Sequence, residues 1–307
     1  MSNWKCVFET NCKQALSDAE VNGDMDLAVD WLRKRGVAVA AKKSDRTAND
    51  GLVGLHCADG IVSVVEVNSE TDFVARNDVF QSAVTSIGKA AIELGGQTLR
   101  TIDPLELGLL KVGNETISEL LTRCTATVGE SLRLKRAFTL SGDVIGTYVH
   151  NVRGVGCGTQ VAAVVLDVGD ASARREEIQD LANALAMHTV GAQPMFLSSI
   201  PEEFQNKEKE LEKERLLQEL QTDGKEIDPE VAEKRVDKKV DKLMKKLSNE
   251  SVFINQVFVG LPSPLAPKAK DIKGLLAAAG KTLGTTINIK AGLRVQVGAE
   301  EYVEMLP

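Results

Sequence analysis

The spacing of apolar residues predicts a small helical module near the start of the chain. Residues 12–36 place apolar positions three and four apart in two short stretches, and an Asn-Gly-Asp tripeptide at 22–24 separates them. This pattern predicts two amphipathic helices. Gly36 is predicted to end the second helix, and the polar, basic stretch 37–50 is predicted to be a linker. Only weakly patterned residues precede these helices, so the module at 1–36 is predicted to have an incomplete first helix.

A strand pattern with alternating apolar positions follows the linker. Strands are predicted at 52–55 and 61–67, joined by an Asp-Gly turn at 59–60, which is a strong hairpin signal. Apolar residues then return to helical spacing from about Asp78 to Leu94. The hairpin and its helix predict a first core subdomain at 51–140.

The same order of elements occurs a second time. Strands are predicted at 144–149 and 161–168 around a glycine-rich turn, with a helix from about residue 173 to residue 190. Two hairpin-plus-helix units favour duplicated subdomains with antiparallel sheets. The second subdomain is predicted at 141–201 and 249–307.

The composition changes sharply between these two parts of the second subdomain. Residues 202–248 are dense in charge, with apolar residues at helical spacing on both sides of a Thr-Asp-Gly break at 222–224. Asp228 and Pro229 offer a cap and a first position for a second helix. The segment is predicted to be an inserted antiparallel helical hairpin that projects from the body. Its role is open between a solvated surface helix pair and a partner-binding arm.

Strand patterns return at the end of the chain. They are predicted at 252–259 and 286–297, around a helix at about 270–279. The whole chain is therefore predicted to be an α+β protein with a small helical amino-terminal module, two core subdomains and one inserted helical hairpin.

Composition narrows the possible functions. The 307 residues carry 37 Lys and Arg against 44 Asp and Glu, a formal charge of −7, which lacks the basic field that binding to a phosphate backbone needs. We therefore expect no direct nucleic-acid partner. No apolar run is long enough to predict a membrane-spanning helix, and the first residues lack the layout of a secretory signal. We expect that the protein works where it is made, or that the chain begins after a leader.

The cysteines give no sign of a disulfide framework or a metal site. They are odd in number and scattered, without a Cys-x-x-Cys pair or a histidine at metal spacing. We interpret them as reduced packing residues, and we predict no metal and no cofactor. These cysteines are Cys6, Cys12, Cys57, Cys124 and Cys157.

Two glycine patterns resemble nucleotide-binding loops and are rejected. Between Gly274 and Gly280 lie five residues where a phosphate-binding loop needs four, and no strand precedes them. We interpret Gly280 as the end of a helix. The glycines at 154, 156 and 158 lie between two strands, which indicates a hairpin turn and not a dinucleotide site. The histidines at 56, 150 and 188 lie near no nucleophile in a catalytic context.

The segment Glu66–Asn77 is the most informative one. It follows a strand and precedes a helix, and Thr71 or Asp72 could cap a turn there. Glu70 and Asp72 could form an acid pair for proton transfer or metal binding. The pattern by itself favours a plainer interpretation, in which the turn is capped and Phe73 folds into the core.

This twelve-residue run resembles the central signature of the elongation factor Ts family, position for position. Residues 11–36 are similar to the last two helices of that family's amino-terminal, ubiquitin-associated-like module. Similarity continues in family order through Ala41–Lys43, Arg46, Gly51–Val53, Val128–Glu130, Arg136, Tyr148–His150, Ala186–His188, Gln193-Pro194, Gln256–Phe258 and Val297-Gly298.

The resemblance implies a guanine nucleotide exchange factor without catalytic chemistry of its own. Its partner would be elongation factor Tu, both GDP-bound and nucleotide-free. In the family the Asp-Phe pair enters the partner's G domain, which implies that Asp72 and Phe73 do so here. Phe73 would wedge between helices of the partner. The wedge would disturb the site that holds Mg²⁺ and the phosphates, and GDP would be released. The residues that the resemblance places in the interface are Thr71, Asp72, Phe73, Val74, Val128, Gly129 and His150.

The resemblance assigns Val128, Gly129 and His150 to a second contact region, from the second subdomain, and implies that the helical hairpin adds further interface.

A competing hypothesis is a ubiquitin-associated-type adaptor, which only residues 12–36 support. Three segments are similar to plant-type mitochondrial members, so a mitochondrial location is predicted: Arg33–Gly36, Met187–Val190 and Phe196–Ser198. The alternatives are the bacterial cytoplasm or a plastid.

Overall fold

The computed structural model describes residues 12–18, 20–43, 46–169, 174–222, 229–260 and 264–306. The predicted incomplete first helix lies outside these residues. So do most of the break that was predicted within the helical hairpin and the predicted cap at Asp228.

The first predicted hairpin is confirmed. Strands β1 (Asp50–Ala58) and β2 (Ile61–Ser69) pair antiparallel, with Ala58 opposite Ile61 next to the turn. Asp59 and Gly60 form this turn with φ of 51° and 74°, the left-handed conformation that an Asp-Gly hairpin turn adopts.

The first sheet also contains strands for which the sequence analysis made no prediction. Its order is β3-β6-β2-β1-β8, with antiparallel pairing throughout. The added strands are β3 (Leu99–Ile102), β6 (Arg133–Ser141) and β8 (Cys157–Gly158). The short strand β8 comes from the glycine-rich turn, so this turn joins the two predicted subdomains.

The second sheet confirms the second hairpin and the last predicted strand. Its order is β11-β10-β9-β7, again antiparallel. The strands are β7 (Val144–His150), β9 (Gln160–Val168), β10 (Ile287–Gln296) and β11 (Val303–Met305). A separate two-stranded ribbon consists of β4 (Lys111–Val112) and β5 (Glu115–Thr116).

The two sheets pack against each other and share one core. Alternate side chains of β9 explain this: Val161, Ala163 and Val165 face the first sheet, whereas Ala162, Val164 and Leu166 face helices. Helices α3 (Asp78–Ala91) and α5 (Ile117–Val128) cover the outer face of the first sheet, near the short helix α4 (Pro104–Gly108). Helices α6 (Arg175–Ala192) and α9 (Ile272–Leu283) cover the second sheet. Both predicted units therefore contribute to one layered body.

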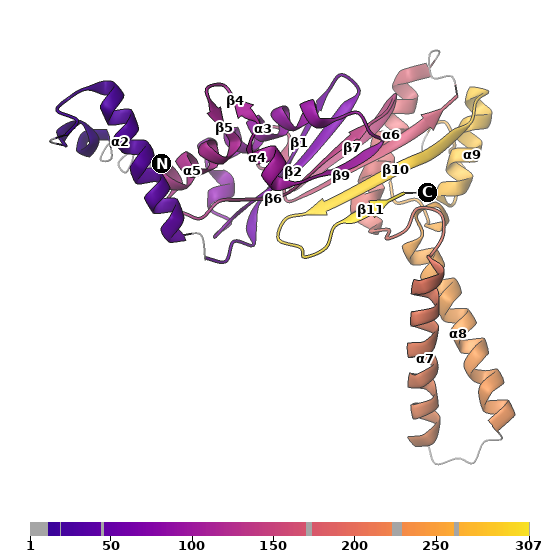
Figure 1. The fold of residues 1–307 in the computed structure, drawn as a ribbon. Coiled ribbons are helices and arrows are strands. Elements are labelled where there is room, and N and C mark those ends of the chain that lie inside the picture. Colours follow the sequence, from indigo (N-terminus) through magenta and orange to yellow (C-terminus); the bar gives the residue numbers. More distant parts are fainter. Residues whose placement is uncertain are drawn as a thin grey trace.

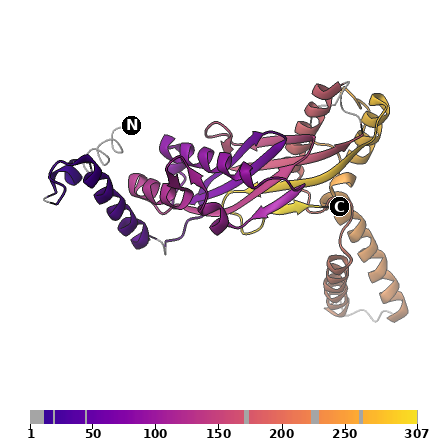
Figure 2. The same cartoon turned by 45° about the horizontal axis from the view of Figure 1, so that its top comes forward.

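The predicted end of the second amino-terminal helix at Gly36 is wrong. Helix α2 runs from Met25 to Lys43, through the first half of the predicted linker. Gly36 lies inside it, facing Ala126 and Thr122 of α5, where the lack of a side chain allows close packing. Alanine and lysine after Gly36 favour helix, so tertiary packing and local propensity together continue it. Figures 1 and 2 show α2 beside α5 at one end of the body.

Two predictions near the end of the chain are also wrong. Residues 252–259 do not form a strand: Phe253–Asn255 is a 3-10 turn (η4), flanked by isolated bridges at Val252 and Val257. Phe253 is buried in the core between α6 and α9, so the apolar run fills a gap between helices. Gly280 does not end α9, because the left-handed cap is Gly284. The rejection of a phosphate-binding loop there agrees with the helix that contains both Gly274 and Gly280.

The predicted helical hairpin is confirmed, and it projects from the body at the end away from α2 (Figures 1 and 2). It consists of α7 (Glu202–Thr222) and α8 (Pro229–Ser251). Val236 and Val240 are buried and pack with Met244 in a small cluster of their own.

A buried polar network fixes the base of this arm. The backbone N–H of Val259 donates to His188 Nδ1 at 3.0 Å, and His188 Nε2 lies 2.9 Å from Gln256 Oε1. The proton therefore sits on Nε2 of a neutral ring. Gln256 Nε2 in turn donates to the carbonyls of Ala192 and Glu250, near the ends of α6 and α8. Burial lowers the pKa of His188, and the Gln256 hydrogen bond opposes this shift.

A second buried polar cluster joins the two sheets. Glu66 of β2 pairs with Arg136 of β6, with 2.6 Å between Oε2 and Nε. Glu66 Oε1 also accepts from the backbone N–H of Gly298, just after β10, at 3.0 Å. Gly298 has φ +74°, and a Cβ there would lie 2.2 Å from the Asn49 carbonyl oxygen. Glycine is thus required where this turn closes over the carboxylate.

Candidate functional site

The turn between β2 and α3 carries the exposed aromatic residue of the site. After Ser69 the chain makes a 3-10 turn, η1 (Val74–Arg76), and enters α3 at Asn77. Asn77 Oδ1 accepts from the N–H groups of Val79 and Phe80 at 2.9 and 3.3 Å. The prediction that Thr71 or Asp72 caps the turn is wrong, because η1 has no side-chain cap, and Asn77 caps the helix that follows.

Phe73 points out of the molecule. Its exposed fraction is 73%, whereas the next residues, Val74 and Ala75, are buried at 1% and 4%. The interpretation that Phe73 folds into the core is wrong, since the tight η1 turn directs Val74 and Ala75 inward in its place. Asp72 is exposed beside it, and its carbonyl accepts from Ala75 N–H. An exposed phenylalanine on an anchored turn is unusual enough to suggest an interaction site.

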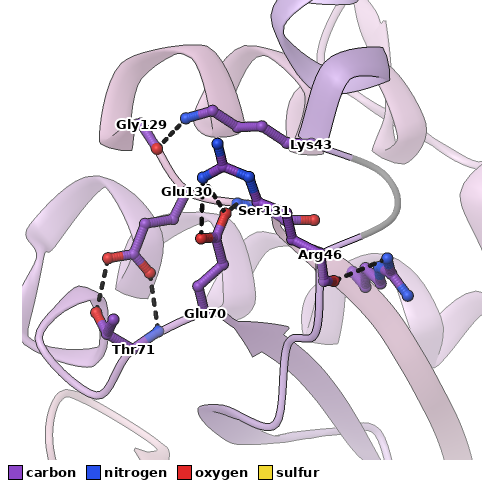
Figure 3. A network of polar contacts seen from close by, with 8 residues as sticks. Lys43, Arg46, Glu70, Thr71, Gly129, Glu130 and Ser131 are labelled. Carbon is purple, nitrogen blue, oxygen red and sulfur yellow. Dashed lines mark hydrogen bonds and ion pairs between the residues drawn. The ribbon is translucent and has the colours of Figure 1, made fainter.

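Two carboxylates hold this turn to the end of α5 in a reciprocal arrangement, which we call the carboxylate clamp (Figure 3). Glu130 accepts from the backbone N–H of Thr71 at 2.9 Å and from its hydroxyl at 2.6 Å. Glu70 accepts from the backbone N–H of Ser131 at 2.7 Å. Each segment thus binds the backbone of the other with a charged acceptor, which gives strong and directional hydrogen bonds.

Basic residues from the end of α2 complete the clamp. Lys43 donates to the carbonyl of Gly129, and Arg46 Nη1 lies 3.2 Å from Glu70 Oε2. The Ser131 N–H and the Arg46 guanidinium lower the pKa of Glu70 below its ordinary value, and partial burial opposes this. Figure 3 shows Lys43 and Arg46 reaching the same two segments from one side.

Val128 and Gly129 lie beside the Phe73 turn and not with the second sheet. Gly129 is the left-handed cap of α5, with φ 78°, and it is exposed, whereas Val128 is buried at 1%. The placement of these two residues in the second subdomain is therefore wrong. In this conformation the side chains of Val128 and Val74 are inaccessible to a partner, and they support the exposed residues from beneath.

His150 lies at the end of β7 in the second sheet. Its Nδ1 is 3.3 Å from the hydroxyl of Tyr148, two residues earlier on the same strand. The loop after His150 returns to the first sheet, where Gln81 of α3 bridges it to the Phe73 turn: Gln81 Nε2 donates to Arg153 O and to Ala75 O at 2.7 and 2.8 Å. His150 is therefore connected to the turn through a loop and one side chain.

The site offers a contact surface and no evident chemistry. Glu70 is occupied by Ser131 and Arg46, so Glu70 and Asp72 do not form the acid pair that was considered. Among the described residues, no group of three or more His, Cys, Asp or Glu is placed to hold a metal ion. The described helices include none that is long and apolar enough to span a membrane.

Sequence reasoning missed Glu130, Ser131 and Gln81 as members of the site. Glu130 belongs to the Val128–Glu130 motif that carried the resemblance, which was the available signal. No local signal marks Gln81, because the polar positions of an amphipathic helix accept many residue types and the bridge depends on a loop 72 residues away.

Comparison with known proteins supports the family resemblance. The family model for Elongation factor TS matches residues 70–299. Elongation factor Ts of Caulobacter sp. (strain K31) is 34% identical over 304 residues, which cover 97% of this chain and 88% of that protein. Elongation factor Ts of Caulobacter vibrioides is 35% identical over 295 residues, covering 94% and 86%. Elongation factor Ts of Sinorhizobium fredii is 33% identical over 290 residues, which cover 94% of this chain and 87% of that protein.

These relatives are bacterial proteins. They agree with the bacterial alternative and give the mitochondrial prediction no support. The matched region begins at Glu70 of the clamp and covers the elements from η1 to β10, including the arm. The chain belongs to the elongation factor Ts family, whose members are nucleotide exchange factors.

Proposed function

We propose that this protein binds elongation factor Tu in its GDP-bound state and promotes GDP release by disturbing the partner's Mg²⁺ and phosphate site, so that GTP can load. The observation that carries the proposal is Phe73, exposed at 73% at the tip of a turn that the carboxylate clamp holds in place. The proposed contacts around it are Thr71, Asp72, Gly129 and His150.

Phe73 is suited to act as an anchor. Transferring an exposed phenylalanine side chain into an apolar pocket is worth about 1.5–3 kcal/mol, and such anchors often dominate an interface. The clamp fixes the turn before binding, so little conformational entropy is lost when the side chain enters the partner. A rigid aromatic wedge can then displace the elements that hold Mg²⁺ and phosphate.

Exchange of this kind needs no catalytic group on this chain. If the protein and GDP bind one partner with negative coupling, each weakens the affinity of the other by the same factor. We therefore propose that the chain acts by binding alone. The competing hypothesis of a ubiquitin-associated-type adaptor stays a prediction; the packing of α2 against α5 supports a role of the amino-terminal helices within the exchange factor.

The test is release of a fluorescent GDP analogue from Caulobacter vibrioides elongation factor Tu. We expect the protein to accelerate release and Phe73→Ala to lower the acceleration at least about tenfold, the loss typical of an interface anchor. Leu105→Ala is the matched control, because Leu105 is equally exposed, on α4. Circular dichroism should show that both variants fold. A folded Phe73→Ala variant that retains full exchange activity would contradict the proposed role of Phe73.

A further inference from the structure

A second exposed apolar segment lies next to the Phe73 turn. Residues 151–156, which we call the valine loop, connect β7 to β8 and carry Val152 and Val155 with exposed fractions of 64% and 93%. The loop thus presents two valines to solvent close to the exposed phenylalanine. Single exposed apolar residues are common, but adjacent ones on anchored backbone suggest an interaction surface.

The valine loop is held by backbone hydrogen bonds on both sides of Val155. Arg153 N–H donates to Cys157 O at 2.8 Å, and Cys157 N–H donates to Gly154 O at 3.1 Å. Leu55 N–H of β1 donates to Gly156 O at 2.7 Å. Gly156 has φ +68°, and a Cβ there would lie 2.6 Å from Leu55 O, so only glycine allows this close approach. The backbone around Val155 is therefore fixed against the first sheet.

Gln81 ties the valine loop to the Phe73 turn. The side-chain amide nitrogen of Gln81 donates to the carbonyl oxygens of both Ala75 and Arg153, so these two oxygens lie close together. Ala75 is two residues after Phe73, and Arg153 is two residues before Val155. Gly154 leaves room for this bridge, since a Cβ there would lie 2.4 Å from Gln81 Oε1. The turn and the loop therefore form one preorganised surface.

We infer that the valine loop is a second apolar contact for the partner that receives Phe73, with Val155 as its anchor. This inference rests on the proposed function and extends it to residues outside the family signature. Continuity supports it: the loop runs from His150 to the Phe73 turn, so a partner that contacts both must lie against the loop. The partner surface opposite Val155 is apolar, because a charged surface would lose hydration there without a matching group.

The experiment measures binding of the full chain to nucleotide-free Caulobacter vibrioides elongation factor Tu. Val155→Asp places a charge at the proposed anchor, and Val155→Ser removes its apolar character without adding charge. Leu105→Asp is the matched control, because Leu105 is exposed at 79% on α4, outside the residues proposed to contact the partner. Thermal unfolding of all variants should match that of the unchanged protein, since these side chains make few contacts.

We expect Val155→Asp to weaken binding at least about tenfold and Val155→Ser about threefold, while Leu105→Asp binds normally. Gln81→Leu should weaken binding as well, because it releases the loop from the turn. Normal binding by Val155→Asp, together with weak binding by Phe73→Ala, would overturn the inference and leave the proposed function standing. Failure of the unchanged protein to bind elongation factor Tu would remove both.

Discussion

The carboxylate clamp and the His188 network each join segments that are distant in sequence, but they use opposite chemistry. The clamp is formed by charged groups at the surface, where Arg46 and Glu70 remain in contact with water. The His188 network is neutral, and the side chains of His188 and Gln256 are buried between α6 and the base of the arm. One holds the proposed contact surface in place, and the other holds the arm.

The difference shows how burial selects the polar groups. A buried network must stay uncharged and satisfy every donor and acceptor, so removing one member leaves others without partners. A surface network can exchange a lost partner for water, so its members are individually less costly to remove. The following predictions test this contrast, beginning with the largest expected effect.

His188→Leu should have the largest effect. It removes the acceptor for Val259 N–H and leaves Oε1 of the buried Gln256 without its donor. We expect the free energy of unfolding to fall by about 2–4 kcal/mol, measured by urea denaturation. His56→Leu is the control, since His56 lies partly exposed in β1, and it should change stability by less than about 0.5 kcal/mol. Equal effects of the two substitutions would contradict the importance of the network.

Acidification should break the His188 network before it affects the clamp. Burial lowers the pKa of folded His188 below the ordinary 6.5, so the unfolded chain binds the proton more readily. Stability from this group is complete above about pH 6.5 and is lost as pH falls toward the folded pKa, at most about 1.4 kcal/mol per pH unit. The glutamine in His188→Gln cannot titrate, so the free energy of unfolding of this variant should depend less steeply on pH between pH 6.5 and 5. The same pH dependence in the variant and in the unchanged protein would contradict the role of His188. The titration of His56 contributes equally to both proteins and cancels in the comparison.

Thr71→Val should have a moderate effect on the clamp. It removes the 2.6 Å bond from the hydroxyl to Glu130 and retains the bond from the backbone N–H. We expect a loss of about 1 kcal/mol in the free energy of unfolding, because the bond is to a charged acceptor. Thr127→Val is a suitable control, since its hydroxyl bonds only to the carbonyl of Arg123 in its own helix. A larger loss from Thr127→Val would place the stabilising contact outside the clamp.

Arg46→Ala should have the smallest effect. Arg46 is 55% exposed, and Glu70 keeps its bond to Ser131 N–H without it. We expect the free energy of unfolding to change by less than about 0.5 kcal/mol, and the change to shrink further in 0.5 M salt. A loss as large as that for His188→Leu would contradict the contrast between the two networks.

Local rules in the sequence were sufficient for much of the fold. The Asp59-Gly60 turn fixed the first hairpin because these residues accept positive φ, and apolar spacing identified α3 and both helices of the arm. The glycines at 154 and 156 were correctly assigned to a loop between strands, whereas Gly158 belongs to the short strand β8. The family signature located the Phe73 turn as the candidate site before any geometry was known.

Tertiary structure decided which residues work together. Thr71 and Glu130 are 59 residues apart, and no periodicity within a helix or strand relates them. Phe73 faces solvent because Val74 and Ala75 fill the core beneath it, and α2 continues past Gly36 because α5 packs against it. The sequence determined the local elements through backbone preference and apolar spacing. The clamp, the exposure of Phe73 and the Gln81 bridge depend on contacts between segments distant in sequence, which exist only in the folded chain.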